Sequence, residues 1–126
     1  MVSVVLYPEE IRILLREPSG LVYPYIEKKA KQVVRLAKAQ VGVDTGALKA
    51  SIGYTIRGGQ PVYAKITASN KIAMIHHEGT QPHIIKPKNG KALRVGNRGT
   101  IVVTRVVHHP GTKPNKFLTD PLRAVF

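Results

Sequence analysis

The sequence contains no cysteine and no tryptophan, and only two phenylalanines among its 126 residues. The absence of cysteine excludes disulfide bonds, thiolate zinc sites and a cysteine nucleophile. No apolar run approaches the roughly 18 residues that a membrane-spanning helix requires. The apolar segment Met1–Tyr7 has no basic region and is too short for a signal peptide. We therefore expect a soluble protein with no membrane partner.

Acidic residues are scarce: seven Asp and Glu stand against twenty Lys and Arg, which gives a formal net charge of +13. Residues 1–30 carry four basic and four acidic side chains, whereas residues 31–126 carry sixteen and three. The range Gln81–Lys116 has eight basic side chains and no acidic one. Such a field attracts polyanions or acidic protein surfaces, and composition does not distinguish the two.

The core must be aliphatic, because aromatic residues are few while valine and isoleucine number fifteen and eleven. These β-branched residues favour strands over an all-helical bundle. The length suits a single domain over residues 1–126, and 43% hydrophobic residues can supply its core. We predict an α+β fold in which a long amphipathic helix packs on a small antiparallel sheet, with a short C-terminal helix.

The hydrophobic periodicity predicts the helices. Apolar residues recur three or four positions apart from Val22 to Val41, which indicates the long helix. Pro8 can begin an earlier, shorter helix, because proline is tolerated in the first turn. Further short helices are expected after a cap at Asp44 or Thr45, over 71–77, and at the C-terminal end.

Strands are predicted where β-branched residues alternate between turn signals. Val2–Tyr7 is expected to form a short strand, and 53–57 and 62–68 a hairpin. Residues 83–107 are expected to form an antiparallel meander, with a hairpin at Asn89-Gly90 and a second turn over 96–99. Because this segment is basic and only partly apolar, we expect it to project from the core as an arm.

Two similar segments, His76–Thr80 and His108–Thr112, each contain a histidine pair followed by Gly-Thr. The histidines and Glu78 offer metal-ligating atoms, but no helical His-x₃-His spacing is present. We therefore expect neither a metal nor another cofactor there. The preferred interpretation is two turns, in which glycine supplies an unusual dihedral angle and threonine bonds the local backbone.

The sequence favours binding over catalysis. No carboxylate pair stands out, and neither a phosphate-binding loop nor a G-x-S-x-G elbow is present. Cations on the meander could follow a phosphate backbone without reading bases, since the meander has no aromatic residue for stacking. A small basic nucleic-acid-binding protein, such as a ribonuclease, is therefore the alternative hypothesis. The cations are Lys86, Lys88, Lys91, Arg94, Arg98 and Arg105.

Three stretches in order resemble a family of small neck proteins of long-tailed bacteriophages. Val43–Ile52 is similar to its "hydrophobic-Asp-Thr-Gly-x-Leu-x-x-Ser-Ile" signature, and Ile75–Thr80 is similar to its "Tyr/His-x-Glu/His-x-Gly-Thr" segment. Gly111–Arg123 resembles its closing "x-Pro-x-x-Phe-Leu-x-x-Pro-Leu" segment. The resemblance spans roughly residues 22–126. The histidine-rich turns and the basic meander are longer than the family's pattern.

The resemblance implies a non-enzymatic virion protein, made in the bacterial host cytoplasm and located at the head–tail junction. Such a protein would form a ring with itself, typically a hexamer, around the DNA channel. Its neighbours would be adaptor, stopper or tail-terminator proteins, with non-specific contact to DNA in the channel. The basic arm could face either an acidic partner or the DNA. The candidate ring-interface residues are Asp44, Thr45, Leu48, His76, His77, His108, His109, Phe117 and Leu118.

Overall fold

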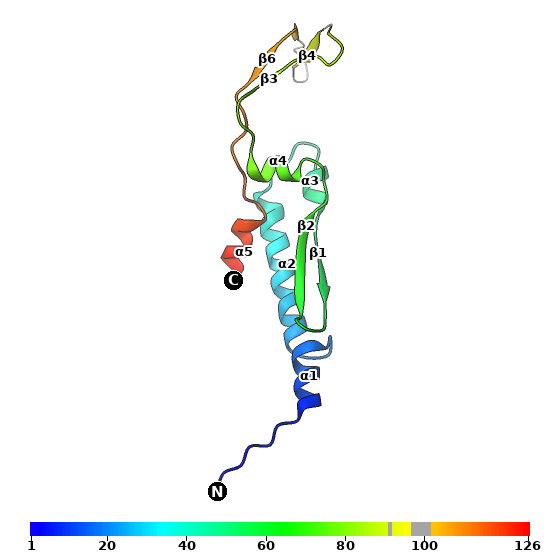
Figure 1. Ribbon diagram of the computed structural model, residues 1–126, viewed down its shortest axis with the longest axis vertical. Helices are drawn as coiled ribbons and strands as arrows, with labels where there is room; N and C mark the ends of the chain where they lie inside the picture. The colour runs from blue at the N-terminus through cyan, green and yellow to red at the C-terminus, as the bar shows by residue number, and fades with distance from the viewer. Residues whose placement is uncertain (91, 97–101) are drawn as a thin grey trace. The chain divides into compact units, whose positions relative to one another are not determined.

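The computed structural model describes residues 1–90, 92–96 and 102–126, which divide into two compact units. Unit 1 comprises Met1–Ala73 and Lys116–Phe126, and unit 2 comprises Met74–Asn115. The fold is α+β, as predicted (Figure 1). No helix in the described ranges is long and apolar enough to span a membrane. The elements are α1 (Pro8–Arg16), α2 (Val22–Gln40), α3 (Ala47–Ala50), β1 (Ile52–Arg57), β2 (Tyr63–Ala68), α4 (Ala73–Glu78), β3 (His83–Ile85), β4 (Leu93–Val95), β5 (Val102–Thr104), β6 (Val107–His109) and α5 (Thr119–Val125).

Unit 1 is built on α2, which lies against β1 and β2 along its length (Figure 1). The predicted amphipathic stripe buries Ala30, Val33 and Ala37, while lysines and Arg35 occupy the outer face. The predicted hairpin is also confirmed, because β1 and β2 pair antiparallel with Ile52 opposite Ala68. The long helix on an antiparallel sheet therefore forms as the sequence indicates.

The core of unit 1 is small and aliphatic around a single aromatic ring. Phe117 is fully buried, and the segment that carries it returns to α2 from the far end of the chain. Phe117 lies just before α5, the C-terminal helix that the sequence predicts, and Leu118 is the N-cap of this helix. The other buried members of this cluster are Ala37, Val41, Leu48, Ile52 and Ala73, with Val34, Ala68 and Leu118 partly buried around them.

Helix α1 packs beside α2 but buries none of its own residues. It is followed by Gly20, where a Cβ atom would lie 2.3 Å from the carbonyl oxygens of Ile13 and Leu14. Only glycine therefore permits this close turn. The segment before α1, residues 1–7, is not a strand, which corrects the prediction for Val2–Tyr7. The β-branched residues give this segment a local preference for extended backbone, but a strand also needs an edge with which to pair.

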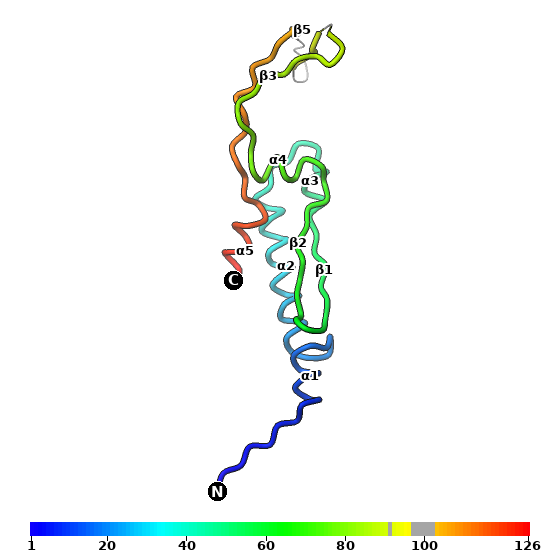
Figure 2. Tube along the Cα trace, viewed as in Figure 1, coloured from blue at the N-terminus to red at the C-terminus, as the bar shows by residue number. Residues whose placement is uncertain are grey.

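Unit 2 contains two short antiparallel ribbons in a nested order. β3 pairs with β6, and β4 pairs with β5, so the outer strands enclose the inner pair along the chain (Figure 2). The predicted meander, with a hairpin between β3 and β4 at Asn89-Gly90, is therefore wrong. Gly90 does form a left-handed turn, with φ of 73°, but the strands on its two sides pair with other strands. The turn expected over 96–99 lies largely outside the described residues.

Candidate assembly site in unit 2

The two Gly-Thr sequences meet at what we call the Gly–Thr crossing, formed by Gly79, Thr80, Gly111 and Thr112. The amide of Thr80 donates to the carbonyl of Thr112 at 3.0 Å, and the reverse bond measures 3.1 Å. The two hydroxyl oxygens are 3.1 Å apart, and the Thr112 amide also lies 3.0 Å from Thr80 Oγ1. The threonines thus bond each other rather than their local backbones, which corrects the expectation of two separate turns.

Both glycines of the crossing are required by the backbone. Gly79 and Gly111 have φ values of 74° and 84°, as the sequence interpretation anticipated. A Cβ atom on Gly79 would lie 2.5 Å from the carbonyl oxygen of Thr112, and one on Gly111 would lie 2.3 Å from that of Thr80. Each glycine therefore makes room for the opposite chain, and the two sequences work as one reciprocal contact.

The end of α4 is fastened to the returning chain by Asn115. Its amide donates to the carbonyl of His76 at 3.1 Å, and its side-chain Nδ2 lies 3.2 Å from His76 Nε2. Because an amide nitrogen can only donate, His76 Nε2 accepts. His77 Nδ1 lies 2.7 Å from the Glu78 carboxylate. Asn115 and His76 therefore join the end of α4 to the returning chain, whereas the contact between His77 and Glu78 joins neighbours in the sequence.

His83 and His109 face each other across the β3–β6 ribbon, with ring centroids 4.9 Å apart. His83 Nδ1 lies 2.9 Å from the carbonyl of Gln81, so this nitrogen carries a proton. His109 Nδ1 accepts from the Gly111 amide at 3.0 Å, so in the neutral ring the proton sits on Nε2. The two imidazoles thus have opposite tautomers.

These tautomers limit the chemistry of the histidines. A metal needs a lone pair, and of these two rings only His83 offers one, at Nε2, because His109 Nδ1 accepts a hydrogen bond and its Nε2 carries the proton in this tautomer. Across the described ranges, no group of three or more metal-ligating side chains is assembled. His108, the neighbour of His109, is exposed on the opposite face of β6. The stack therefore braces the ribbon.

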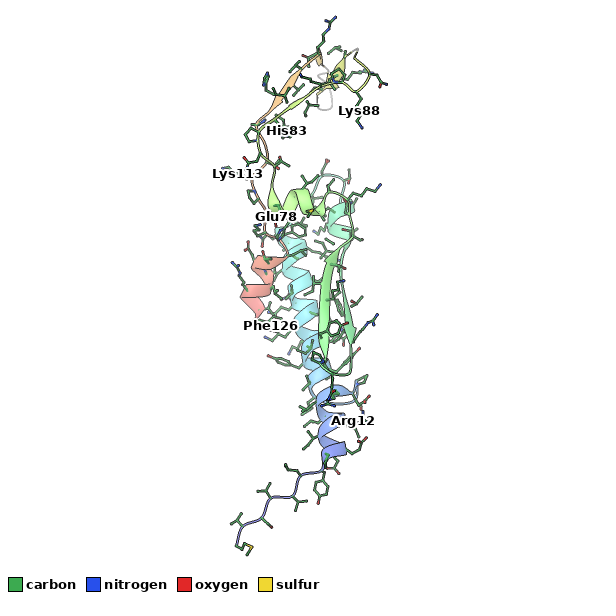
Figure 3. The ribbon with its side chains drawn as sticks, viewed as in Figure 1. Arg12, Glu78, His83, Lys88, Lys113 and Phe126 are labelled. Carbon is green, nitrogen blue, oxygen red and sulfur yellow. The ribbon has the colours of Figure 1, made fainter. Side chains whose placement is uncertain are left out.

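The basic arm, residues 83–107, presents cations without anionic neighbours of its own. Lys86, Lys88, Arg94 and Arg105 are exposed (Figure 3 labels Lys88). None of the ion pairs found among the described residues involves these four. The two remaining cations predicted for the arm, Lys91 and Arg98, lie outside the described residues.

Apolar side chains share the surface of the basic arm with these cations. Ile84 is 54% exposed and Val103 is 64% exposed, and Val95 and Val106 are also open. Alternation along a strand places Arg94 on one face and Leu93 and Val95 on the other. A surface that combines cations with exposed aliphatic groups is better suited to contact with another protein than to exposure to water.

The remaining interface candidates belong to unit 1. Asp44 and Thr45 are exposed, and Thr45 Oγ1 lies 3.4 Å from the amide of Ala47, beside the short helix α3. The N-cap position itself belongs to Gly46, with φ of 82°, rather than to either predicted cap. Leu48 and Phe117 are core residues with 6% and 0% exposure, so their side chains offer no surface to a neighbour.

Two features escaped the sequence interpretation. The pairing of Thr80 with Thr112 joins residues 32 apart, and only the repeated His-His-x-Gly-Thr pattern could have suggested it. The role of Asn115 carried no local signal.

Comparison with protein-family models, curated proteins and solved structures finds no match.

Proposed function

We propose that this chain is a structural protein of the bacteriophage neck, located in the virion at the head–tail interface. It forms a ring, six-fold by the family resemblance, that surrounds the DNA channel and joins the head to the tail. The resemblance of Val43–Ile52, Ile75–Thr80 and Gly111–Arg123 to the neck family motivates this assignment. The partners are further copies of the chain and the neighbouring adaptor, stopper or tail-terminator rings.

The basic arm is the observation that carries the proposal. None of its described residues is buried, its described cations are not in ion pairs, and aliphatic side chains lie open between them. Docking on another surface would bury these open aliphatic groups and give the cations anionic neighbours. Charge complementarity then sets the register of the joint and speeds the encounter, so an acidic protein surface is the partner proposed.

Complementation in vitro tests the function. Purified protein is added to heads and tails of the source phage that lack it, and joined particles are counted. We expect joining to depend on the protein, and an absence of any gain would reject the neck assignment.

A quadruple charge reversal tests the arm. Changing Lys88, Lys91, Arg94 and Arg98 to Glu should abolish joining while unit 1 stays folded. Single reversals should do little, because an exposed ion pair contributes about 0–1 kcal/mol. High salt should weaken joining by the wild type in the same direction.

A matched control separates position from net charge. The control reverses four exposed cations of unit 1, so that the total charge changes equally: Lys28, Arg35, Lys49 and Lys71. This variant should still join heads to tails. Equal loss in both variants would show that net charge alone matters and would remove the arm from the proposal.

The second candidate function is sequence-independent nucleic-acid binding, which the exposed cations among the described residues of the arm also favour. The same two quadruple variants discriminate between the functions in a filter-binding assay with duplex DNA and single-stranded RNA. Tight binding lost only in the arm variant, together with normal head–tail joining, would favour nucleic acid. Cleavage of the RNA would favour the ribonuclease hypothesis.

A further inference from the structure

The segment 1–7 has the composition of a strand but no strand partner within its own chain. It contains three valines and a leucine, and its large apolar side chains are at least 59% exposed. The carbonyl of Tyr7 accepts from the Ile11 amide at the start of α1, and no other backbone hydrogen bond joins this segment to the described ranges. Unpaired backbone groups beside exposed β-branched side chains make a segment that can add to a sheet.

The alternation of the segment defines the face that it would bury. Val2, Val4 and Leu6 fall on one side of an extended chain, whereas Ser3, Val5 and Tyr7 fall on the other. One side is therefore entirely aliphatic. The Val2, Val4 and Leu6 side is therefore the one suited to a core, because only the other side carries hydroxyl groups, on Ser3 and Tyr7.

The β1–β2 sheet of unit 1 is a matching acceptor. It has two strands of six residues each, so both outer edges lack a neighbour in the described ranges. Its inward residues pack on α2, while Thr55 and Lys65 are exposed on the other face. A two-stranded sheet is marginal alone, and a third strand would stabilise it. Seven residues suffice to pair along the whole of either edge.

We propose that the segment 1–7 of one copy adds as a third strand to the β1–β2 sheet of a second copy. A return to its own sheet is disfavoured because α1 begins at Pro8 with no intervening linker. The other end of α1 is tied to the hairpin, since the backbone carbonyl of Arg16 accepts from the Gly59 amide at 3.1 Å. Pro8 lies eight residues before Arg16, and the helical rise of about 1.5 Å per residue therefore places it about 12 Å from that end of the hairpin.

Strand addition of this kind is head to tail, because the donor and acceptor surfaces differ. Repetition of such a contact closes a ring when the rotation per copy permits it. The use of the contact in a ring rests on the proposed function. The strand exchange itself does not, since purified protein alone can test it.

The absence of native cysteine makes disulfide trapping specific. One preparation carries Ser3→Cys, and a second carries Thr55→Cys or Lys65→Cys, which report the β1 and β2 edges respectively. The two preparations are mixed under mild oxidation and resolved without reductant. We expect a mixed disulfide dimer with one of the two strand cysteines, formed at least about tenfold faster than with Lys28→Cys on α2. Equal rates with Lys28→Cys would overturn the proposal.

A double variant, Ser3→Cys with the reactive strand cysteine, tests the intramolecular alternative. A fast-migrating, internally bonded monomer in place of linked copies would overturn the exchange.

A face-specific pair of variants gives an independent readout. Val4→Asp places a charge on the face that would be buried, whereas Val5→Asp places it on the opposite face. Both lie outside the core of unit 1, so both should fold. We expect Val4→Asp to slow the trapping of Ser3→Cys about tenfold and Val5→Asp to change it little. Equal effects would reject burial of the Val2, Val4 and Leu6 face. Trapping can succeed while head–tail joining fails, so the two proposals can be rejected separately.

Discussion

The interactions that stabilise the interior of unit 1 differ from those that stabilise unit 2. Every buried residue that the structure describes lies in unit 1, where Phe117, Ile52 and Val33 are almost inaccessible to solvent. Unit 2 has no buried residue in its described part, and its order rests on short ladders, the Gly–Thr crossing and the His83–His109 stack. Unit 1 is therefore stabilised mainly by buried apolar side chains, and unit 2 by hydrogen bonds and the ring stack.

The ionisable groups are divided in the same way. All five histidines lie in unit 2, whereas all five tyrosines lie in unit 1. Among the described residues, the ion pairs of Arg12 and Lys31 belong to unit 1, and the cations of the basic arm are in none. This division separates a unit with a buried core from a unit whose described cations lie open on the surface.

The largest expected effect comes from truncating the one buried aromatic side chain. Phe117→Ala should destabilise unit 1 by about 3–5 kcal/mol, because it removes buried area and leaves a cavity. Phe126→Ala is the matched control, since that ring is 68% exposed and its loss should change stability by less than about 0.5 kcal/mol. Chemical denaturation monitored by circular dichroism measures both. Similar losses would show that the core is not centred on Phe117.

The helices and the β1–β2 hairpin could be predicted because their signals are local. The spacing of Ala30, Val33 and Ala37 predicts α2, and turn residues between two β-branched runs predict the hairpin. The segment Val2–Tyr7 was predicted wrongly because its propensity is local, whereas pairing needs an edge elsewhere. The partners of Phe117 are equally non-local, so its burial against α2 carries no sequence signature.

The strand order of unit 2 could not be predicted for a related reason. Asn89-Gly90 is a strong local hairpin signal, but the Gly–Thr crossing brings β3 beside β6 and leaves β4 to pair with β5. The hydrogen bonds between distant residues at the Gly–Thr crossing thus override the local turn preference of Asn89-Gly90. The cations of the basic arm were identified from composition alone, while the opposite tautomers of His83 and His109 depend on backbone groups that only the fold supplies.

A second, smaller effect isolates the crossing in unit 2. Gly79→Ala combines an unfavourable φ with a Cβ placed 2.5 Å from a carbonyl oxygen, so the crossing should open. Gly90→Ala is the control, because its φ of 73° is nearly the same but its Cβ would meet nothing within 4 Å. The control should lose only the dihedral preference, about 1–2 kcal/mol.

Hydrogen exchange reads out this difference. Protection of the Thr80 and Thr112 amides should fall at least about tenfold further in Gly79→Ala than in Gly90→Ala, with unit 1 unaffected in both. Loss of protection throughout unit 1 would mean that the two units do not unfold separately.

A third variant probes the contact of β1 with α2. Tyr54 donates to Glu27 at 3.0 Å, and its partial burial and then this bond raise the pKa of the phenol. A raised pKa means that the neutral phenol stabilises the fold, a contribution present below the ordinary tyrosine range and lost as pH rises through the folded value. Tyr54→Phe should remove this part of the alkaline destabilisation. Unfolding curves from pH 8 to 11 for both proteins provide the measurement, and parallel curves would contradict the assignment.

The smallest effect is expected on α1, where Arg12 (labelled in Figure 3) bonds Glu9 at 2.8 Å and also Glu17. The hydrogen bond from Arg12, and then its charge, hold the pKa of Glu9 below the ordinary value. A lowered pKa contributes stability above the ordinary carboxyl range, and that contribution is lost as pH falls through the folded value. Helicity of α1 should therefore fall in acid below about pH 4, and Glu9→Gln should lower this helicity already at neutral pH and flatten its change with pH.

Glu10→Gln removes the same charge from the same turn without touching Arg12, so it should keep the acid transition. Because this network is exposed, 1 M salt should weaken it in the wild type. An acid transition that is the same in Glu9→Gln and Glu10→Gln would assign the effect to the helix terminus instead of the Arg12 contact.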